Sequence, residues 1–401
     1  MEEITGKIYL KERRDKPVKN HHPWIFSGAI ARVDGETTAG NLVSVHDSHG
    51  RFLATGYYNP NSQIRVRLLS WDPQQAVDTA FWKTRIQRAL DGRTALGLGK
   101  NSSAYRLINA EADGLPGLVV DRYDQNLVIQ CLTLGIAQRK EMLVELLLEL
   151  IQPDRIIERS DTAVRRKEGL QPHKELLWGS EIPESVVIRE NRLEFIVDLW
   201  EGHKTGFYLD QRENRFAIGQ PQYVRGKSLL NVFAYTGGFA VYAAAAGAGQ
   251  IVNIDSSIPA LEMAEKNITL NGGVRSADEY IAGNAFEILR FYRDQGDKFD
   301  VAILDPPKFA HRKGDIEKAS RGYKDLNRLA LLLLRRGGLL ATFSCSGQIS
   351  ADLFQKILFS ASVEAERQVQ IIQLLSQAAD HPILLTFPES AYLKGMLCRV
   401  W

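Results

Sequence analysis

The chain has 401 residues, of which 44% are hydrophobic, so it is long enough to form two or three domains. Its formal net charge of +2 is too small to identify a nucleic-acid binder. Three cysteines occur and none forms a C-x-x-C pair, which argues against a disulfide framework, a structural zinc site and an iron–sulfur cluster. Because no apolar run reaches about eighteen residues and no signal peptide begins the chain, we expect a soluble, cytoplasmic protein.

Short alternating segments separated by turns fill the region from Lys7 to about Trp71. Strands are predicted at residues 42–45, 52–57 and 64–69, with turn sequences at residues 47–50 and 59–62. This pattern is typical of a small β-barrel or sandwich, and it predicts a first domain over residues 1–75.

Helical periodicity begins after this region. Helices are predicted at residues 81–98 and 137–150, and two paired strands at 118–120 and 127–131 lie between them. We therefore expect a central α+β domain over residues 76–185. From residue 186 to residue 401, strands alternate with helices, which predicts an α/β domain with a mostly parallel sheet.

A glycine-containing loop lies near the start of this third domain. A strand is predicted at residues 228–233, followed by the loop Ala234–Phe239, an alanine-rich helix at 240–246 and a strand that ends at Asp255. Gly237 and Gly238 allow a tight turn and a close approach of a ligand to the helix N-terminus. Asp255 follows Gly237 by eighteen residues, where a Rossmann-like fold offers a carboxylate to ribose hydroxyls.

The spacing of this loop fits neither a dinucleotide-binding G-x-G-x-x-G sequence nor a P-loop. It resembles instead the loop of class I methyltransferases, which bind S-adenosylmethionine. Asn284 and Ala285 follow a further predicted strand, where this class places a polar residue near the adenine. Tyr235 and Phe239 either contact the cofactor or fill the interface between sheet and helix.

Two tetrapeptides in the last hundred residues carry the groups for chemistry. Asp305-Pro306-Pro307-Lys308 and Ser344-Cys345-Ser346-Gly347 each follow a short apolar run that reads as a buried strand. In an open α/β sheet the carboxyl ends of parallel strands line the ligand crevice, so the Cys345 thiol and the Asp305 carboxylate can face one substrate. The predicted chemistry is attack on a nucleobase. We expect Cys131 and Cys398, both inside predicted strands, to be buried as small apolar residues.

Taken together, six segments resemble the ribosomal RNA large subunit methyltransferase I family over nearly the whole chain. They are His22–Gly28, Glu111–Leu118, Lys204–Arg212, Asp305–Phe309, Arg321–Asp325 and Phe343–Gly347. The resemblance implies an N-terminal RNA-binding PUA barrel, the central α+β domain and a class I, Rossmann-like methyltransferase domain. It also implies S-adenosylmethionine as cofactor, carbon 5 of a cytosine in 23S ribosomal RNA as the target, and no need of a metal or a membrane. The oligomeric state stays open, a homodimer included.

The resemblance also assigns roles to residues. Cys345 would add to carbon 6 of the cytosine, and Asp305 would hydrogen-bond or protonate the ring at N3. The expected cofactor-binding residues are Phe233, Tyr235, Thr236, Gly237, Gly238, Asp255, Asn284, Ala285 and Asp305. The expected substrate-binding residues are Lys308, Phe309, Arg321, Tyr323 and Lys324, with Tyr323 at the start of a helix.

One position departs from the wider RNA cytosine-5 methyltransferases. Many of them carry a second cysteine that assists product release, and the corresponding position here is Lys308. Lys308 is expected to contact phosphate or to lower the thiol pKa of Cys345. The base that removes the carbon 5 proton is not identifiable from the sequence.

Two other functions stay open at this point. Asp-Pro-Pro followed by an aromatic residue resembles the D/N-P-P-Y/F pattern of enzymes that methylate an exocyclic amine of adenine or guanine, in which case Phe309 would matter and Cys345 would not. A non-catalytic ribosome-assembly factor that binds RNA is the second alternative. The intact glycine loop and Asp255 count against it.

Overall fold

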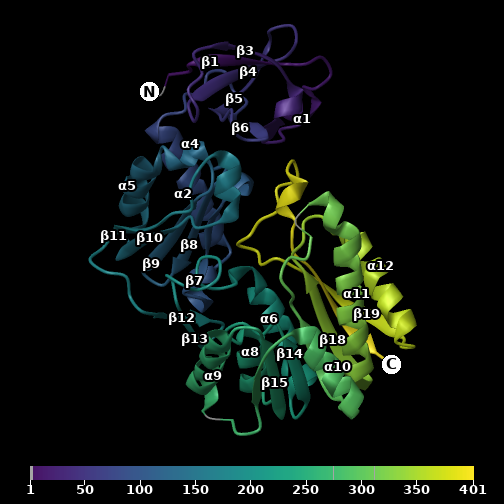
Figure 1. Cartoon of the computed structure of the whole chain (residues 1–401). Helices are drawn as coiled ribbons and strands as arrows, with labels where there is room; N and C mark the ends of the chain where they lie inside the picture. The colour runs from purple at the N-terminus through teal and green to yellow at the C-terminus, as the bar shows by residue number, and fades with distance from the viewer. Residues whose placement is uncertain (1–2, 274, 311) are drawn as a thin grey trace. The chain divides into compact units, whose positions relative to one another are not determined.

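The computed structural model describes residues 3–273, 275–310 and 312–401 (Figure 1). The chain divides into two compact units. The first unit comprises Met1–Ile188, Val197–Leu209 and Ala379–Ser390, and the second comprises Arg189–Ile196, Asp210–Ala378 and Ala391–Trp401. Two segments that the sequence placed in the domain over 186–401 therefore make their contacts within the first unit. No helix in the described part of the chain has both the length and the apolar character needed to cross a bilayer.

A six-stranded sheet with the order β2-β6-β5-β4-β1-β3 forms the N-terminal part of the first unit. The predicted strands are confirmed, and β1 pairs with β4 in parallel while the other pairs are antiparallel. Alternate residues such as Ile8, Val45 and Val66 fill its core. The elements are β1 (Gly6–Leu10), α1 (Lys16–Lys19), β2 (Trp24–Phe26), β3 (Ile30–Gly35), β4 (Leu42–His46), β5 (Phe52–Tyr58) and β6 (Ile64–Ser70).

A five-stranded sheet with the order β11-β10-β9-β8-β7 follows, and α2, α4 and α5 pack on it. The predicted hairpin is confirmed as β8 and β9, and the helix predicted at 137–150 is confirmed as α5, which begins three residues later because the chain leaves helical geometry at Arg139 after the short helix α4. The elements are α2 (Thr79–Ala95), α3 (Leu98–Asn101), β7 (Ala104–Asn109), β8 (Leu118–Tyr123), β9 (Asn126–Cys131), α4 (Leu134–Ala137), α5 (Lys140–Ile151), β10 (Arg155–Arg159) and β11 (Lys174–Trp178).

Buried polar contacts join these two sheets. The Arg67 guanidinium on β6 contacts the carboxylates of Glu111 and Glu168 at 2.8 and 3.0 Å, and the indole of Trp24 donates to Glu111 at 2.8 Å. Arg67 has only 6% of its surface exposed, so the pairs are shielded from water. Removing one partner from such a buried network typically costs about 3–5 kcal/mol. The network therefore links the two sheets firmly within the first unit.

The segment Ala379–Ser390 also packs in the first unit, although it lies between two strands of the second. The Asp380 carboxylate accepts the backbone N–H of Arg106 at 2.8 Å, and the Asp380 carbonyl accepts from Arg93 at 2.9 Å. The ring of Phe387 lies 4.6 Å from that of Trp24, centroid to centroid. These three contacts hold the segment at two residues, Asp380 and Phe387.

The second unit is built on a seven-stranded sheet with the order β16-β15-β14-β17-β18-β20-β19. β20 runs antiparallel to β18 and β19, while the pairs from β16 to β18 are parallel, and a separate two-stranded sheet, β12-β13, precedes it. The strands are β12 (Val186–Glu190), β13 (Leu193–Val197), β14 (Ser228–Val232), β15 (Gln250–Asp255), β16 (Glu279–Ala282), β17 (Phe299–Leu304), β18 (Leu334–Ser344), β19 (Val369–Ser376) and β20 (Lys394–Val400).

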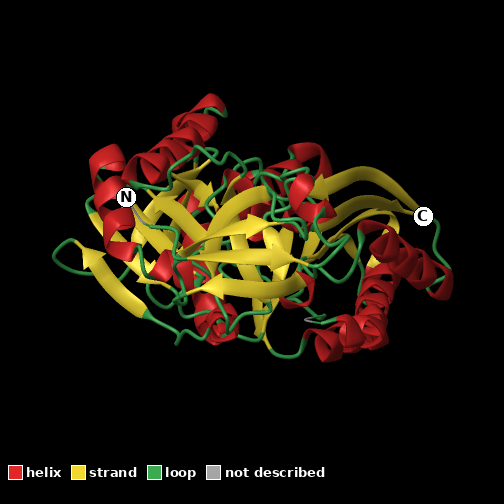
Figure 2. Cartoon of the chain, turned by 90° about the horizontal axis from the view of Figure 1, so that it is seen from above, coloured by secondary structure: helices red, strands yellow, loops and turns green. Residues whose placement is uncertain are grey.

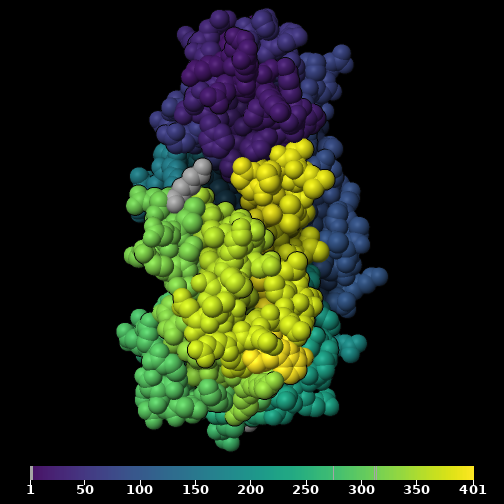
Figure 3. All heavy atoms as spheres, turned by 90° about the vertical axis from the view of Figure 1, so that its right-hand side faces the viewer, coloured from purple at the N-terminus to yellow at the C-terminus, as the bar shows by residue number. Residues whose placement is uncertain are grey.

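Helices cover the sheet, as the red ribbons beside the C-terminal strands show (Figure 2). α8 and α9 pack together on β15, and α10, α11 and α12 form a second group whose outer surface is seen in green to yellow in Figure 3. Leu230, Ile254, Leu326 and Phe354 belong to the core beneath this second group. The helices are α6 (Arg212–Ile218), α7 (Pro221–Val224), α8 (Gly238–Ala245), α9 (Ile258–Gly272), α10 (Ala285–Gln295), α11 (Ile316–Leu333) and α12 (Ala351–Glu364).

The strand order reverses at β14, which has β15 on one side and β17 on the other. The helices that follow β14 and β15, α8 and α9, pack together on β15, whereas those that follow β16, β17 and β18 are α10, α11 and α12 of the second group. Open α/β sheets bind ligands outside the carboxyl ends of the strands at such a reversal. The glycine loop follows β14 and Asp305 follows β17, so both are placed at this point.

Candidate functional site

The two chemical motifs lie at the ends of neighbouring parallel strands, as the sequence predicted. Asp305 follows the last residue of β17 and Cys345 follows the last residue of β18, and Leu304 is paired with Thr342 in the register between them. Asp305 is half-buried, and its backbone N–H donates to the carbonyl of Val232 at the end of β14 at 3.4 Å. One edge of the sheet therefore carries both the carboxylate and the thiol.

A chain of side-chain amides holds the Asp305 carboxylate. Gln211 Nε2 donates to Asp305 Oδ2 at 3.0 Å, and Asn214 Nδ2 donates to Gln211 Oε1 at 2.6 Å. Asn214 also donates to the Ser376 carbonyl at 2.9 Å, which anchors the amides to the end of β19. Gln211 lies in one of the segments that carried the family resemblance, but its role depends on a contact across 94 positions that no local pattern predicts.

The serines on either side of Cys345 fix the backbone of its loop. Ser344 Oγ lies 3.0 Å from the Tyr323 hydroxyl, which lies 3.1 Å from Ser346 Oγ. Ser346 Oγ also accepts the backbone N–H of Ala310 at 3.3 Å, so the loop after β17 and the loop after β18 are joined. Cys345 itself is partly exposed.

The other two thiols differ from Cys345 in their surroundings. Cys131 and Cys398 lie inside β9 and β20 and are fully buried, as expected. Burial raises the pKa of each thiol to about 12. Both are therefore protonated at neutral pH, and thiolates rather than thiols are nucleophiles.

Tyr323 has a different place from the one expected. It lies in the middle of α11 rather than at a helix start, and its side chain is fully buried. Burial raises the pKa of its phenol, so the hydroxyl stays protonated and can serve both serines. A side chain without solvent exposure cannot reach RNA in this conformation, and Tyr323 instead supports the cysteine loop.

The remaining predicted substrate-binding residues separate into two pairs. Lys308 is exposed, and the half-buried ring of Phe309 packs on Tyr323 with 4.6 Å between ring centroids, so both lie near the cysteine loop. Arg321 instead pairs with Glu317 at 3.1 Å along α11, and Lys324 pairs with Glu364 at the end of α12 at 2.7 Å. The structure therefore places Lys308 and Phe309, but not the ion-paired cations, beside the predicted catalytic residues.

A lysine that the sequence did not single out completes this edge. Lys394 begins β20 and is paired with Ser344 in the antiparallel register, and its Nζ donates to the Ser346 carbonyl at 2.8 Å. Burial lowers the pKa of Lys394 to about 8, the negative charge of Cys345 opposes this, and the positive charge of Lys308 adds to it. Nothing near Lys394 in the sequence indicates the site, because only the return of β20 brings it to Cys345.

The glycine loop after β14 has an unusual backbone. Phe233, Tyr235 and Gly237 have φ values of +62°, +47° and +78°, and the first two are uncommon for residues with a side chain. The Asp255 carboxylate fixes the loop, because its Oδ2 accepts the Tyr235 N–H at 2.8 Å and its Oδ1 accepts the Ser257 N–H at 3.0 Å. Backbone strain of this kind clusters at ligand sites.

The loop residues fit a bound nucleoside cofactor. Thr236 Oγ1 is buried and has no hydrogen-bond partner among the described residues, which is costly unless a ligand or water supplies one. A Cβ at Gly237 would lie 2.8 Å from the Cβ of Ala264, so only glycine permits this close approach of the loop to α9. Gly238 then begins α8, and its helix N-terminus faces the same loop. Phe239 is buried with its ring 5.6 Å from that of Phe343, so it fills the interface with the sheet.

Asn284 and Ala285 lie at the end of β16, where the sequence placed them. Asn284 Oδ1 accepts the Phe286 N–H at 2.9 Å and caps α10, while the Ala285 side chain is buried in the core. Ala285 can therefore offer a ligand only its backbone. Asn284 retains its amide N–H groups for a ligand while its oxygen serves the cap.

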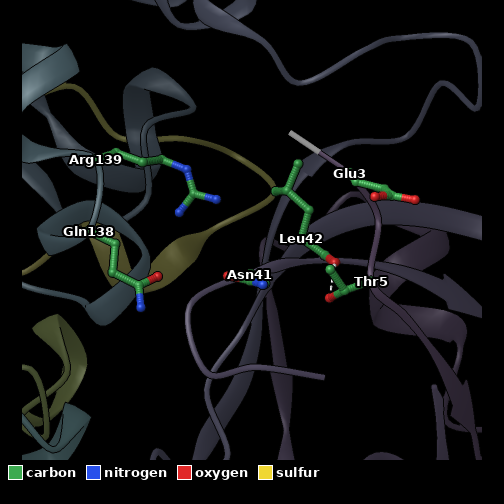
Figure 4. A pocket seen from close by; sticks show the side chains of 6 residues that line it. All are labelled: Glu3, Thr5, Asn41, Leu42, Gln138 and Arg139. Atoms are coloured by element: carbon green, nitrogen blue, oxygen red, sulfur yellow. Dashed lines mark hydrogen bonds between the residues drawn. The ribbon is translucent and has the colours of Figure 1, made fainter. Parts of the chain in front are cut away.

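A cavity of about 430 Å³ occurs in the first unit, away from all predicted site residues. Six residues line it, and Figure 4 shows the bond of Thr5 to the Leu42 carbonyl on its wall. The lining residues are Glu3, Thr5, Asn41, Leu42, Gln138 and Arg139. The chemical groups of this chain are thus concentrated at the sheet edge of the second unit rather than in this cavity.

Comparisons with known proteins identify the domains and the relatives of this chain. A model described as a PUA-like domain matches residues 8–71, and one described as an S-adenosylmethionine-dependent methyltransferase matches residues 163–397. Proteins named ribosomal RNA large subunit methyltransferase I from Aliivibrio fischeri and Escherichia coli O157:H7 are 47% and 45% identical to the chain, covering 99% of it and 100% of their own length.

Solved structures agree with the fold. A putative SAM-dependent methyltransferase from Streptococcus mutans is 21% identical, with a TM-score of 0.84 over 98% of this chain and 99% of that one. A putative methyltransferase solved with SAH is 22% identical, with a TM-score of 0.86 over the same shares of both chains. The predicted fold, a PUA-like domain and a class I methyltransferase domain in a mixed α/β chain, is confirmed.

Proposed function

Because the chain belongs to the S-adenosylmethionine-dependent ribosomal RNA large subunit methyltransferase I family, we propose that it methylates carbon 5 of a cytosine in 23S ribosomal RNA. A ribosomal substrate places this activity in the cytoplasm. The reaction proceeds through a covalent bond between Cys345 Sγ and carbon 6 of the base.

The observation that carries the proposal is the placement of Cys345. It is the partly exposed thiol among three, it follows a strand adjacent to the one that ends before Asp305, and its loop is held by a buried tyrosine. A purely structural cysteine needs none of these features. A nucleophile needs exposure, a fixed position and an acid within reach of the same substrate.

The chemistry explains why a thiol and a carboxyl group are paired. Carbon 5 of cytosine is a poor nucleophile until the Cys345 thiolate adds at carbon 6 and makes the ring an enamine. Asp305, held by Gln211, hydrogen-bonds or protonates N3 as negative charge develops there. S-adenosylmethionine supplies the methyl group that carbon 5 takes. Loss of the carbon 5 proton to a base then allows the carbon–sulfur bond to break, and Cys345 leaves as the thiolate.

The residues of the glycine loop bind the cofactor in this proposal. Asp255 and the loop Phe233–Gly238 hold the nucleoside, with Asn284 and the backbone of Ala285 near the base. The exposed ammonium of Lys308 contacts RNA phosphate. The PUA-like domain binds the RNA, and a single unstacked cytosine enters the site.

A transfer assay tests the proposal. Native protein, Cys345→Ala and Asp305→Asn are incubated with labelled S-adenosylmethionine and 23S ribosomal RNA, and the modified nucleosides are identified by mass spectrometry. We expect 5-methylcytidine with the native protein and a loss of at least about a hundredfold with either variant. Binding of S-adenosylmethionine to Cys345→Ala, measured by calorimetry, is the control for folding.

Two outcomes would favour the alternatives. Retained transfer by Cys345→Ala, with methylated adenine or guanine as the product, would favour an exocyclic-amine methyltransferase. Absence of S-adenosylmethionine binding by the native protein would favour a non-catalytic assembly factor.

A further inference from the structure

The side chain of Lys394 spans the backbone of the proposed nucleophile. Its Cα is paired with that of Ser344, the residue before Cys345, and its Nζ reaches the carbonyl of Ser346, the residue after it, at 2.8 Å. The lysine side chain therefore bridges the two residues on either side of Cys345, and the charge of Cys345 acts on its ammonium. The hydrogen bond to Ser346 uses one of the three ammonium protons, so two further N–H groups can donate to another acceptor.

No carboxylate among the described residues forms an ion pair with the Lys394 ammonium. Cys345 and Lys308 are the groups whose charges act on its ammonium, Tyr323 from α11 stays protonated, and Asp305 lies at the end of β17 with its carboxylate bonded to Gln211. Other lysines of this unit form salt bridges, as Lys324 does with Glu364, but Lys394 forms none with the described residues. The half-buried ammonium of Lys394 and the thiolate form of Cys345 therefore attract each other.

We propose that the Lys394 ammonium stabilises the Cys345 thiolate and so acts as the positioning residue that activates the nucleophile. This inference rests on the proposed function, in which Cys345 is the nucleophile. The Cys345 proton leaves Sγ for water, and the electron pair left on sulfur faces Lys394 until it forms the bond to carbon 6. When that bond breaks at the end of the cycle, the pair returns to sulfur and the ammonium stabilises it again.

The assignment changes the role expected of Lys308. An exposed ammonium acts on a thiolate through water, where unit charges interact weakly, whereas a half-buried one acts through a medium of lower dielectric. Lys394 is thus the stronger influence on Cys345, and Lys308 is available for phosphate.

The test measures thiolate formation without RNA. Iodoacetamide alkylates Cys345 in the full-length protein, mass spectrometry follows the modified peptide from pH 5 to 10, and the buried Cys131 and Cys398 stay unmodified over the same time. We expect Lys394→Met to lower the alkylation rate at pH 7 about tenfold and to move the titration to higher pH, because a nearby cation lowers a thiol pKa. Lys394→Arg, which keeps the charge, should restore most of the rate.

Lys298→Met is the matched control. Lys298 also donates Nζ to a backbone carbonyl, that of Leu332 at 2.6 Å, but it lies outside the cysteine loop, so its replacement should leave the titration unchanged. An unchanged titration in Lys394→Met, or an equal loss in Lys394→Arg, would overturn the proposal. Either result is distinct from failure of the proposed function, which would appear as methyl transfer by Cys345→Ala.

Discussion

Gln211 holds the carboxylate of Asp305 by a hydrogen bond of 3.0 Å, and Gln211 is itself 2% exposed. The amide fixes which way the carboxylate points, since Asn214 on α6 in turn fixes the amide. In the proposed reaction Asp305 acts at N3 of the base and would gain from such support, because a misplacement of about 1 Å can cost about a hundredfold in rate.

Gln211→Leu removes the donor while keeping a side chain of similar size. We expect kcat for methyl transfer to fall by about tenfold to a hundredfold while KM for RNA changes little, since the bond orients a reacting group rather than binding the substrate. Steady-state kinetics on 23S ribosomal RNA measure both constants. Gln250→Leu is the control, because Gln250 at the start of β15 donates a similar but exposed bond of 2.9 Å to Glu279 at the start of β16. A rise in KM alone would contradict this role of Gln211.

Tyr323→Phe tests the support of the cysteine loop. The ring would still fill the core, but the hydroxyl that bonds Ser344 and Ser346 would be lost. Two buried serine hydroxyls would each lose a partner, so we expect the free energy of unfolding to fall by about 1–3 kcal/mol and transfer activity to fall with it. Urea denaturation gives the first value and the transfer assay the second. Tyr292→Phe, which loses a surface bond to Glu279, should change neither by a comparable amount.

Lys394 should lower stability at neutral pH, in addition to its proposed effect on Cys345. Its pKa is 10.5 in the unfolded chain and about 8 in the fold, so between these values the unfolded state binds the proton and the folded state does not. The free energy of unfolding therefore rises with pH through this window, and the cost of burying the ammonium is present in full below pH 8.

Lys394→Met should consequently raise the free energy of unfolding at pH 7 by about 1 kcal/mol. This is less than the pKa shift alone would give, because the lysine keeps some solvent contact and because the variant loses the bond to Ser346. The advantage of the variant should shrink as the pH approaches 10.5. Urea denaturation at pH 7 and pH 10 compares the two proteins. A variant that is less stable than the native protein at pH 7, or whose advantage grows with pH, would contradict this account.

The sequence predicted the parts of the site that local patterns encode. Asp305, Cys345 and the glycine loop follow short apolar runs and Asp255 ends another, so the prediction of buried strands from these runs was enough to find them. Gln211, Asn214 and Lys394 escaped prediction because each reaches the site through a partner far away in the chain. Tyr323 was misplaced for a related reason: its neighbours Arg321, Lys324 and Asp325 are polar, and only the packing of α11 on the sheet shows that the ring between them faces the core.

The excursion of Ala379–Ser390 has a consequence for dissecting the protein. The chain leaves the second unit after β19, makes its contacts through Asp380 and Phe387 in the first, and returns to form β20 with Lys394. A fragment covering residues 186–401 would keep the segment Ala379–Ser390 but separate it from Arg106 and Trp24, so the contacts of Asp380 with Arg106 and of Phe387 with Trp24 would be lost. A fragment of residues 1–185 would lack the segment Ala379–Ser390, which packs in the first unit. No single cleavage yields two intact modules, and grafting this catalytic unit onto another RNA-binding domain would require a redesigned connection between β19 and β20.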